Sequence, residues 1–297
     1  MKIPRLHPLL TGVFLGSVAF SSPATFVTAL PVATDQLLIR FNVQPVLSTM
    51  GFYGTQFPVN LGYGLTSRWA LFVNVNQGFA GSGDLSSAGE GDLSAYARFT
   101  LFKIDKPKST LRIAPLAGAF IPSGSNTLSG PQGLLPAALQ TGSGTFDPYL
   151  GVTMGYNTVN WGMALDSTYR ANPATNRGIS PGSEYRADAQ VEFKLLPWRL
   201  PDEGLPKILV LSLESNYVHD SRALVKGAST INSGGDVLKQ DAILELATLH
   251  WQAGAGAQIP VMQELPGSGR VKQRAGFFVF FEYYLAAPSW RHRRGRS

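Results

Sequence analysis

The chain has 297 residues, of which 15% are charged and 44% are hydrophobic. Its formal net charge of +6 comes from the two ends, because Lys2 and Arg5 precede the body and four arginines follow residue 290, so residues 6–290 sum to zero. This balance gives no indication of nucleic-acid binding. The chain has no cysteine, which excludes disulfides and thiol chemistry. After the N-terminal segment, no run reaches the roughly 18 apolar residues that a membrane-spanning helix needs.

The N-terminal segment reads as a signal peptide covering residues 1–29. Lys2 and Arg5 precede the apolar run PLLTGVFLGSVAF, whose length matches the core of a secretory signal. Small residues supply the cleavage point, for which we prefer the VTA at 27–29 and keep the AFS at 19–21 as the alternative. A retained anchor helix is the other interpretation, although Pro8 flanks the run and the run is short for spanning a membrane.

Residues 183–196, SEYRADAQVEFKLL, alternate strictly in polarity. Tyr185, Val191 and Phe193 belong to a small or apolar row, and Asp188 and Glu192 belong to a polar row. Such alternation predicts a strand with two unlike faces. A soluble sheet would turn the apolar row toward a core, whereas a membrane barrel would turn it toward lipid and the polar row toward the lumen. This strand does not separate the two environments.

The rest of the chain repeats this pattern in about twelve segments. The predicted strands cover residues 36–46, 56–66, 68–79, 91–102, 110–122, 145–157, 159–170, 183–196, 208–220, 241–261 and 271–285. Segment 241–261 is too long for one strand and its apolar parity changes near His250, so we expect two strands around a very tight turn there. No stretch of amphipathic helix has comparable strength, and an even number of strands suits a single-chain bacterial barrel.

The connections between these segments indicate the environment. Links after alternate strands are short, whereas the others are longer and rich in Gly, Ser, Asn and Pro; the longest covers residues 123–144, and the link at 197–207 is an exception on the short side. Short turns on one side and long loops on the other are typical of an outer-membrane barrel. Tyrosines and tryptophans also fall near both predicted rims, where they anchor membrane proteins.

We therefore predict an all-β protein, a transmembrane antiparallel up-and-down β-barrel of about 12 strands in the bacterial outer membrane. The barrel is expected at residues 30–285, followed by a basic C-terminal tail at 286–297. The expected partners are outer-membrane lipid, a small organic solute and the barrel-assembly machinery, and we expect no nucleic acid.

The barrel interpretation places a set of charged side chains on the inner wall. They are Arg40, Arg98, Arg112, Asp147, Asp166, Arg170, Glu184, Arg186, Asp188, Glu192, Lys194, Glu214, Lys272, Arg274 and Glu282, with Asp92 at the head of one strand. About twelve strands enclose a narrow interior. One interpretation is an ion-paired network that fills the lumen and stiffens the wall. The other is a pore of mixed charge that selects by size more than by sign.

We predict no catalytic residue, no metal site and no cofactor. The sequence YVHDSR places His219, Asp220 and Ser221 at the outer end of a strand, where a barrel hydrolase would carry its catalytic residues. A triad needs Ser and His within hydrogen-bond reach and a third group that orients the His. Neighbouring residues of a strand point to opposite faces, and His219 has the parity of the lipid-facing row. No two histidines have the spacing of metal ligands, and residues 81–92 read as a mobile surface loop without the acidic spacing of a calcium site.

Four short motifs carry a resemblance to a known family. They are Gly91-Asp92, IPSGS at 121–125, QTGSGTFDPYLG at 140–151 and AQIPVMQEL at 257–265. In this order the chain resembles, over roughly residues 35–285, the family of outer-membrane transporters named for the MetA pathway of phenol degradation. The resemblance implies a barrel of about twelve strands and passage of small organic molecules. The chain departs from the family in the insert GLLPAALQ at 133–140 and in the tail that follows the last predicted strand.

The resulting functional prediction is a channel for passive passage of small, aromatic or otherwise apolar, organic solutes. A closed barrel whose outer loops bind something at the surface is the alternative, and an outer-membrane hydrolase comes third. The insert adds one specific hypothesis. Leu134, Leu135 and Leu139 either pack a short helix onto the rim, or dip into the mouth as a gate or capture site for apolar solutes.

Overall fold

The computed structural model describes residues 29, 32–48, 51–131, 133–135, 139–173, 179–180, 182–197, 207–225, 227–229, 233–265 and 272–286. Except for Ala29, the predicted signal peptide lies outside the described residues. The same holds for the predicted C-terminal tail except for Ala286.

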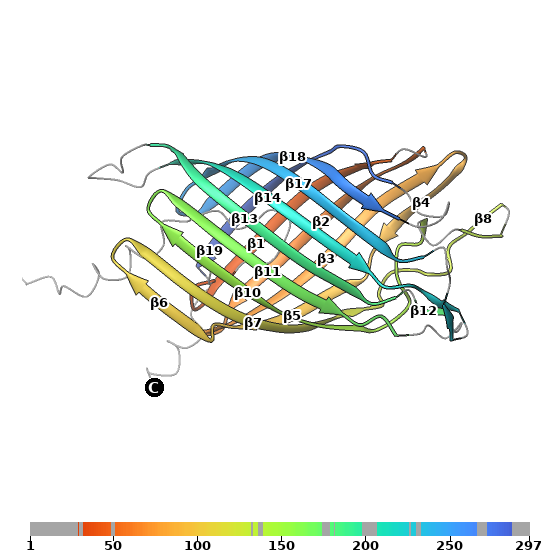
Figure 1. Cartoon of the computed structure of the whole chain (residues 1–297), viewed down its shortest axis with the longest axis horizontal. Helices are drawn as coiled ribbons and strands as arrows, with labels where there is room; N and C mark the ends of the chain where they lie inside the picture. Colours follow the sequence, from red (N-terminus) through yellow and green to blue (C-terminus); the bar gives the residue numbers. More distant parts are fainter. Residues whose placement is uncertain are drawn as a thin grey trace, which may run out of the picture.

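Within the described residues, twelve long strands form one closed antiparallel barrel (Figure 1). They are β1 (Gln36–Leu47), β2 (Phe52–Gly64), β3 (Trp69–Ser82), β5 (Leu93–Phe99), β7 (Ser109–Ile121), β10 (Asp147–Thr158), β11 (Trp161–Arg170), β13 (Glu184–Leu196), β14 (Ile208–Asp220), β17 (Gly235–Ala247), β18 (Trp251–Glu264) and β19 (Gly276–Ala286). Each pairs with the next along the chain, and β19 closes the ring on β1, with Phe41 opposite Phe281. The predicted fold class is confirmed.

The tight turn predicted near His250 is also present, because β17 ends at Ala247 and β18 begins at Trp251. The Thr248 side chain holds this turn, since its hydroxyl donates to the carbonyl oxygen of Trp251 over 2.8 Å and accepts a hydrogen bond from the Trp251 N–H over 3.1 Å. The change of apolar parity in the sequence therefore marks the reversal of the chain.

Two connections differ from the sequence prediction. Residues 81–92 are not a mobile loop, because β3 continues to Ser82 and pairs with β4 (Leu85–Glu90) in a hairpin. Strand β3 continues past the rim of the barrel wall and gives these residues a pairing partner. The strand that begins with β5 is interrupted at 100–101 and resumes as β6 (Phe102–Lys106), which pairs with β7 and shortens the predicted link to a turn at 107–108.

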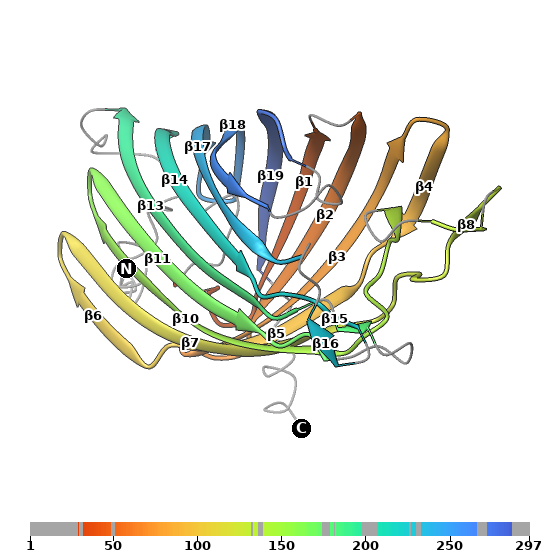
Figure 2. The same cartoon turned by 45° about the vertical axis from the view of Figure 1, so that its right-hand side comes forward.

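The barrel has two unlike ends. The turns at 65–68, 107–108, 159–160 and 248–250 lie at one end, which we call the turn end (Figure 1). β13 also ends and β14 begins there, so the predicted exception at 197–207 belongs to this end, and the other long connections leave from the opposite end, which we call the loop end. Short strands occur in these connections, namely β8 (Ser129–Gly130) with β9 (Gly133–Leu134), and β12 (Ile179–Ser180) with β15 (Leu224–Val225) and β16 (Ala228–Ser229). Figure 2 shows β8 projecting beyond the barrel wall and β15 and β16 beside the loop end.

The exterior of the wall is apolar. Phe277 is 65% exposed and Val191 41% exposed, whereas Asp188, on the other face of the same strand as Val191, is buried. Exposed aromatic side chains lie at both ends: Trp69 and Trp161 begin strands at the turn end, and Tyr169 lies near the loop end. A closed ring satisfies every wall backbone group internally, as a bilayer requires. With its apolar exterior and aromatic rims, the chain has the architecture of an outer-membrane β-barrel.

No helix among the described residues is both long and apolar enough to cross a membrane.

Candidate functional site

The inner wall carries most of the charged side chains that the sequence assigns to the lumen. Those buried on the inner face are Arg40, Arg98, Arg112, Asp147, Asp166, Asp188, Glu192, Lys194, Glu214 and Glu282. Arg170 and Glu184 are partly buried at the loop end. Arg186 is more exposed and lines a cavity at that end, as described below.

Several of these charges form ion pairs. Arg40 Nε lies 2.5 Å from Glu282 Oε2 across the β1–β19 seam, and Gln252 Nε2 donates to Glu282 Oε1 over 2.8 Å. At the loop end, Glu184 accepts from Arg170 over 3.1 Å and from Arg186 over 2.6 Å. These contacts agree with the interpretation of an ion-paired network, because buried charges are costly unless they are paired and hydrogen-bonded.

Acidic side chains gather on the wall formed by β11, β13, β14 and β17. Asp166 stands directly opposite Asp188, and Glu214 directly opposite Asp241. Like charges in such positions destabilise a sheet unless donors compensate them, and Asn216 and Gln258 donate to Asp241 over 2.8 and 3.1 Å. We call this surface the acidic wall. Asp241 was not among the predicted lumen residues, although the alternation of polar and apolar residues over 241–247 carried the signal.

A row of aromatic rings runs along the inner face of the neighbouring part of the barrel, on β3, β5, β7 and β10. Phe72 stacks on Tyr96 with ring centroids 4.7 Å apart, Tyr149 follows at 6.1 Å from Tyr96, and Phe120 at 5.4 Å from Tyr149. We call these four residues the aromatic track. It rises from Phe72, near the turn end of β3, to Tyr149, near the loop end of β10.

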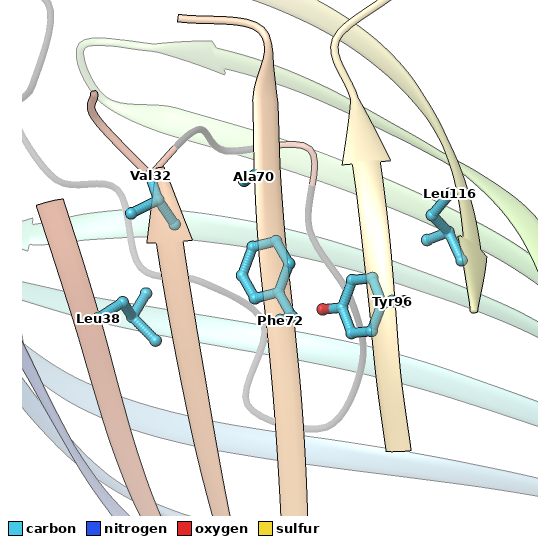
Figure 3. Packing of buried hydrophobic residues seen from close by; sticks show 6 residues of the cluster. All are labelled: Val32, Leu38, Ala70, Phe72, Tyr96 and Leu116. Carbon is cyan, nitrogen blue, oxygen red and sulfur yellow. The ribbon is translucent and has the colours of Figure 1, made fainter. Parts of the chain in front are cut away.

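Aliphatic side chains flank the part of the aromatic track that lies nearer the turn end. Val32, Leu38, Ala70 and Leu116 form one buried cluster with Phe72 and Tyr96 (Figure 3). In Figure 3, Phe72 and Tyr96 lie side by side on neighbouring strands, between Leu38 on one side and Leu116 on the other. Part of the lumen is therefore apolar, in contrast to the charged interior that the sequence analysis emphasised.

Guanidinium groups lie over both ends of the aromatic track. Arg98 Cζ is 4.8 Å from the centroid of Phe72, and Arg170 Cζ is 4.7 Å from the centroid of Phe120. Such cation–π contacts hold the rings and the cations together inside the lumen. The track thus combines flat apolar faces with positive charge.

Inward-facing glycines make room for these rings. A Cβ at Gly62 would lie 2.8 Å from the ring of Phe72, and one at Gly256 would lie 2.5 Å from the ring of Phe278. Both distances are shorter than real side-chain contacts, so the rings can lie flat across the neighbouring strand only because glycine stands there.

The lumen is filled with side chains from the turn end to the middle of the barrel. Near the turn end Glu282 is only 1% exposed and Gln252 is 0% exposed, and at mid-strand Glu214 is 1% exposed. At the loop end the lumen widens into a cavity of about 320 Å³, which we call the mouth cavity. It is lined by Gln44, Pro45, Leu47, Gln56, Arg186, Asp188, Asn216, Val218, Lys239, Gln258, Gln273, Arg274, Gly276, Phe277 and Phe278.

Two predicted lumen cations and the predicted loop leucines lie at the loop end. Lys272 and Arg274 precede β19, which begins at Gly276, so they do not stand on a strand; Arg274 lines the mouth cavity. Leu135 and Leu139 are buried within their loop, while Leu134 is 53% exposed on β9. The described residues of this loop do not contribute to the lining of the mouth cavity.

Asp92 ties this loop to the barrel. It lies between β4 and β5, outside the strands, and its carboxylate accepts from Gly124 N–H over 3.1 Å and from Ser143 N–H over 2.7 Å. Two of the sequence motifs, at 121–125 and 140–151, therefore meet at Asp92. These motifs hold the loop against the barrel through their hydrogen bonds to the Asp92 carboxylate.

His219 faces outward at the loop end, as its parity predicts, with its side chain 48% exposed. Its Nδ1 is 2.9 Å from Asp236 Oδ1, and Tyr217 donates to the same oxygen over 2.6 Å. The hydroxyl oxygen of Ser221 accepts a hydrogen bond from Ser183 N–H over 2.7 Å. The histidine is thus paired with a carboxylate of the next strand, which sequence adjacency did not reveal. The described residues contain no group of three or more His, Asp or Glu side chains able to hold a metal ion.

Comparison with known proteins gives structural matches only. No family model and no curated protein matches the chain. The chain is similar in structure to the COG4313 outer membrane channel from Pseudomonas putida F1, with a TM-score of 0.64 and 15% identity over 90% of this chain and 100% of that one. It is also similar to the NanC porin, with a TM-score of 0.49 and 10% identity over 84% of this chain and 100% of that one. The first match supports the fold of an outer-membrane channel, and the second is too weak to carry an argument.

Proposed function

We propose that this chain is an outer-membrane channel through which small organic solutes, aromatic ones in particular, pass passively along the aromatic track. The observation that carries the proposal is the continuous row of rings from Phe72 to Phe120 on the inner wall. A flat apolar solute can exchange contact with one ring for contact with the next, so that no single site holds it too tightly to leave.

Passage requires the packed middle of the barrel to open locally. Side chains fill the lumen there. The rings of the aromatic track, together with Leu38 and Leu116, line one side of this packed, narrow region. A narrow route would open through rotamer changes of these lumen side chains, without rearrangement of the hydrogen-bonded wall. The packed state favours slow passage of small solutes over a wide water-filled pore.

The test uses Tyr96→Ala, which removes the central ring of the aromatic track. Purified protein is reconstituted into vesicles, and swelling is compared in phenylalanine and in leucine, which carry the same charges and differ in the ring. We expect wild type to favour phenylalanine and Tyr96→Ala to reduce that preference about two- to tenfold, the worth of one aromatic contact. Ion conductance in a planar bilayer should rise, because the constriction loses a large side chain.

Tyr169→Ala is the matched control, because it removes an exposed tyrosine from the outside of the barrel. It should leave both the preference and the conductance unchanged. If wild-type vesicles neither swell nor conduct above protein-free vesicles, the channel proposal fails and the closed barrel with surface-binding loops is favoured. If Tyr96→Ala conducts more but keeps the preference for phenylalanine, the aromatic track does not select the solute.

The resemblance to the family named for the MetA pathway of phenol degradation is consistent with this proposal but does not carry it. The rings of the inner wall support passage of aromatic solutes independently of that resemblance. The signal peptide at 1–29, the barrel at 30–285 with its basic tail at 286–297, and recognition by the barrel-assembly machinery belong to the same proposal. Together they describe an exported, membrane-inserted channel without catalytic function.

A further inference from the structure

We propose that the mouth cavity is a binding site for small organic anions, carboxylates above all. This inference rests on the proposed channel function, since it names the solutes that the loop end captures before passage. It depends on residues other than the aromatic track, and it can be tested without transport.

The lining of the mouth cavity is rich in cations. Arg186, Lys239 and Arg274 face it, against the single carboxylate of Asp188. Arg186 is paired with Glu184 over 2.6 Å. Among the described residues, neither Lys239 nor Arg274 has a carboxylate oxygen within ion-pair distance. Two positive charges are therefore available to a solute.

Amide groups add neutral donors beside these cations. Gln44 and Gln56 stand opposite each other on β1 and β2, and both line the mouth cavity. Asn216 and Gln258, on the other side, are engaged with Asp241. A carboxylate accepts several hydrogen bonds and pairs well with guanidinium and ammonium groups. An organic ammonium would instead meet the one carboxylate of the lining and its three cations, so the lining favours anions.

Size and polarity narrow the class of ligand. A volume of about 320 Å³ is at the lower end of the range for small-molecule sites. Phe278 supplies a buried apolar surface beside the polar groups. A carboxylate attached to one ring or to a short chain fits this combination. Deeper in the barrel, Glu214 of the acidic wall repels such an anion. Arg98 and Arg112, on β5 and β7, attract it toward the aromatic track.

The test compares sodium benzoate with benzamide, which has the same ring and nearly the same size but no charge. Each is titrated by calorimetry into folded protein in detergent. We expect wild type to bind benzoate about tenfold more tightly than benzamide, the value of one well-placed charge interaction. The double variant Lys239→Gln/Arg274→Gln should lose this preference. The single variant Arg274→Gln, which lies outside the strands, should lose part of it and provides a second test if the double variant does not fold.

Lys272→Gln is the matched control, because it removes a cation from the same connection but outside the lining. It should keep the preference for benzoate. Equal binding of benzoate and benzamide, no binding of either, or an unchanged preference in Arg274→Gln would overturn the proposal. Loss of the preference in Lys272→Gln as well would also overturn it, because the general charge of the loop end would then be the cause. Binding is measured without a membrane, so a failure to conduct would refute only the channel function.

Discussion

Val191 and Gln190 are neighbours on β13 and provide a direct test of which face of the barrel meets lipid. Val191 is 41% exposed and stands between Met163 of β11 and Leu213 of β14. Replacing Val191 with Arg places a charge near the middle of the strand on the apolar exterior. An arginine at that depth of a membrane barrel costs about 2–4 kcal/mol, and the folding equilibrium constant should fall about 30- to 700-fold.

Gln190→Arg makes the same chemical change on the inner face. Gln190 is buried there, and its Nε2 lies 3.4 Å from Glu214 Oε1. A guanidinium at this position keeps a donor toward Glu214 and adds a compensating charge to the acidic wall, so its cost should be limited to the strain of a longer side chain. We expect a loss of about 1 kcal/mol from such overpacking, which is the lower end of its usual range and less than the cost of Val191→Arg.

The assay is urea unfolding in lipid vesicles, followed by tryptophan fluorescence and by the heat-dependent shift in gel migration that folded barrels show. The difference between the two variants is the informative quantity, because both insert the same side chain into the same strand. Equal destabilisation by Val191→Arg and Gln190→Arg would refute the assignment of faces. A larger cost for Gln190→Arg would indicate that the exterior face is in contact with water.

The remaining predictions concern the loop end. Single cysteines introduced at Ser129 and Ser229 should react with an impermeant thiol reagent added to intact cells, while one at Lys106, at the turn end, should not. Labelling at Lys106 would mean that the turn end faces outward. The chain has no native cysteine, so all labelling comes from the introduced residue. Deleting residues 130–140 should leave conductance and the preference for aromatic solutes unchanged, since the described part of this loop does not line the mouth cavity. If the deletion variant folds, as judged by normal heat-dependent migration, but shows altered conductance, the loop would act as a gate or capture site after all.

The sequence alone determined which face of the wall each strand residue occupies. Side chains alternate along a strand with a period of two, so polarity that alternates with the same period reports the face without knowledge of the neighbours. Asp188 and Glu192 are buried on the inner face and Val191 is exposed for this reason. The number of strands and the tight turn before Trp251 followed from the same local rule.

The same rule also failed where it was applied beyond a strand's end. Counted back from β19 in steps of two, Lys272 and Arg274 would face inward. The strand begins only at Gly276, however, so the alternation of strand residues does not apply to them. Residues 85–90 showed the composition of a loop and yet form β4, because β3 is long enough to give them a partner. Strand ends depend on pairing, which composition does not report.

Which inward side chains meet follows from the assembled barrel and not from any single strand. Phe72, Tyr96 and Tyr149 all have inward parity, but they come from three strands, and their contact depends on the register of each pairing and on the tilt of strands in a closed ring. The mouth cavity likewise combines residues from β1, β13 and β17, which are far apart in the chain. Alternation is a property of one strand's backbone, whereas register and closure are properties of the whole barrel, and the aromatic track and mouth cavity exist only at that level.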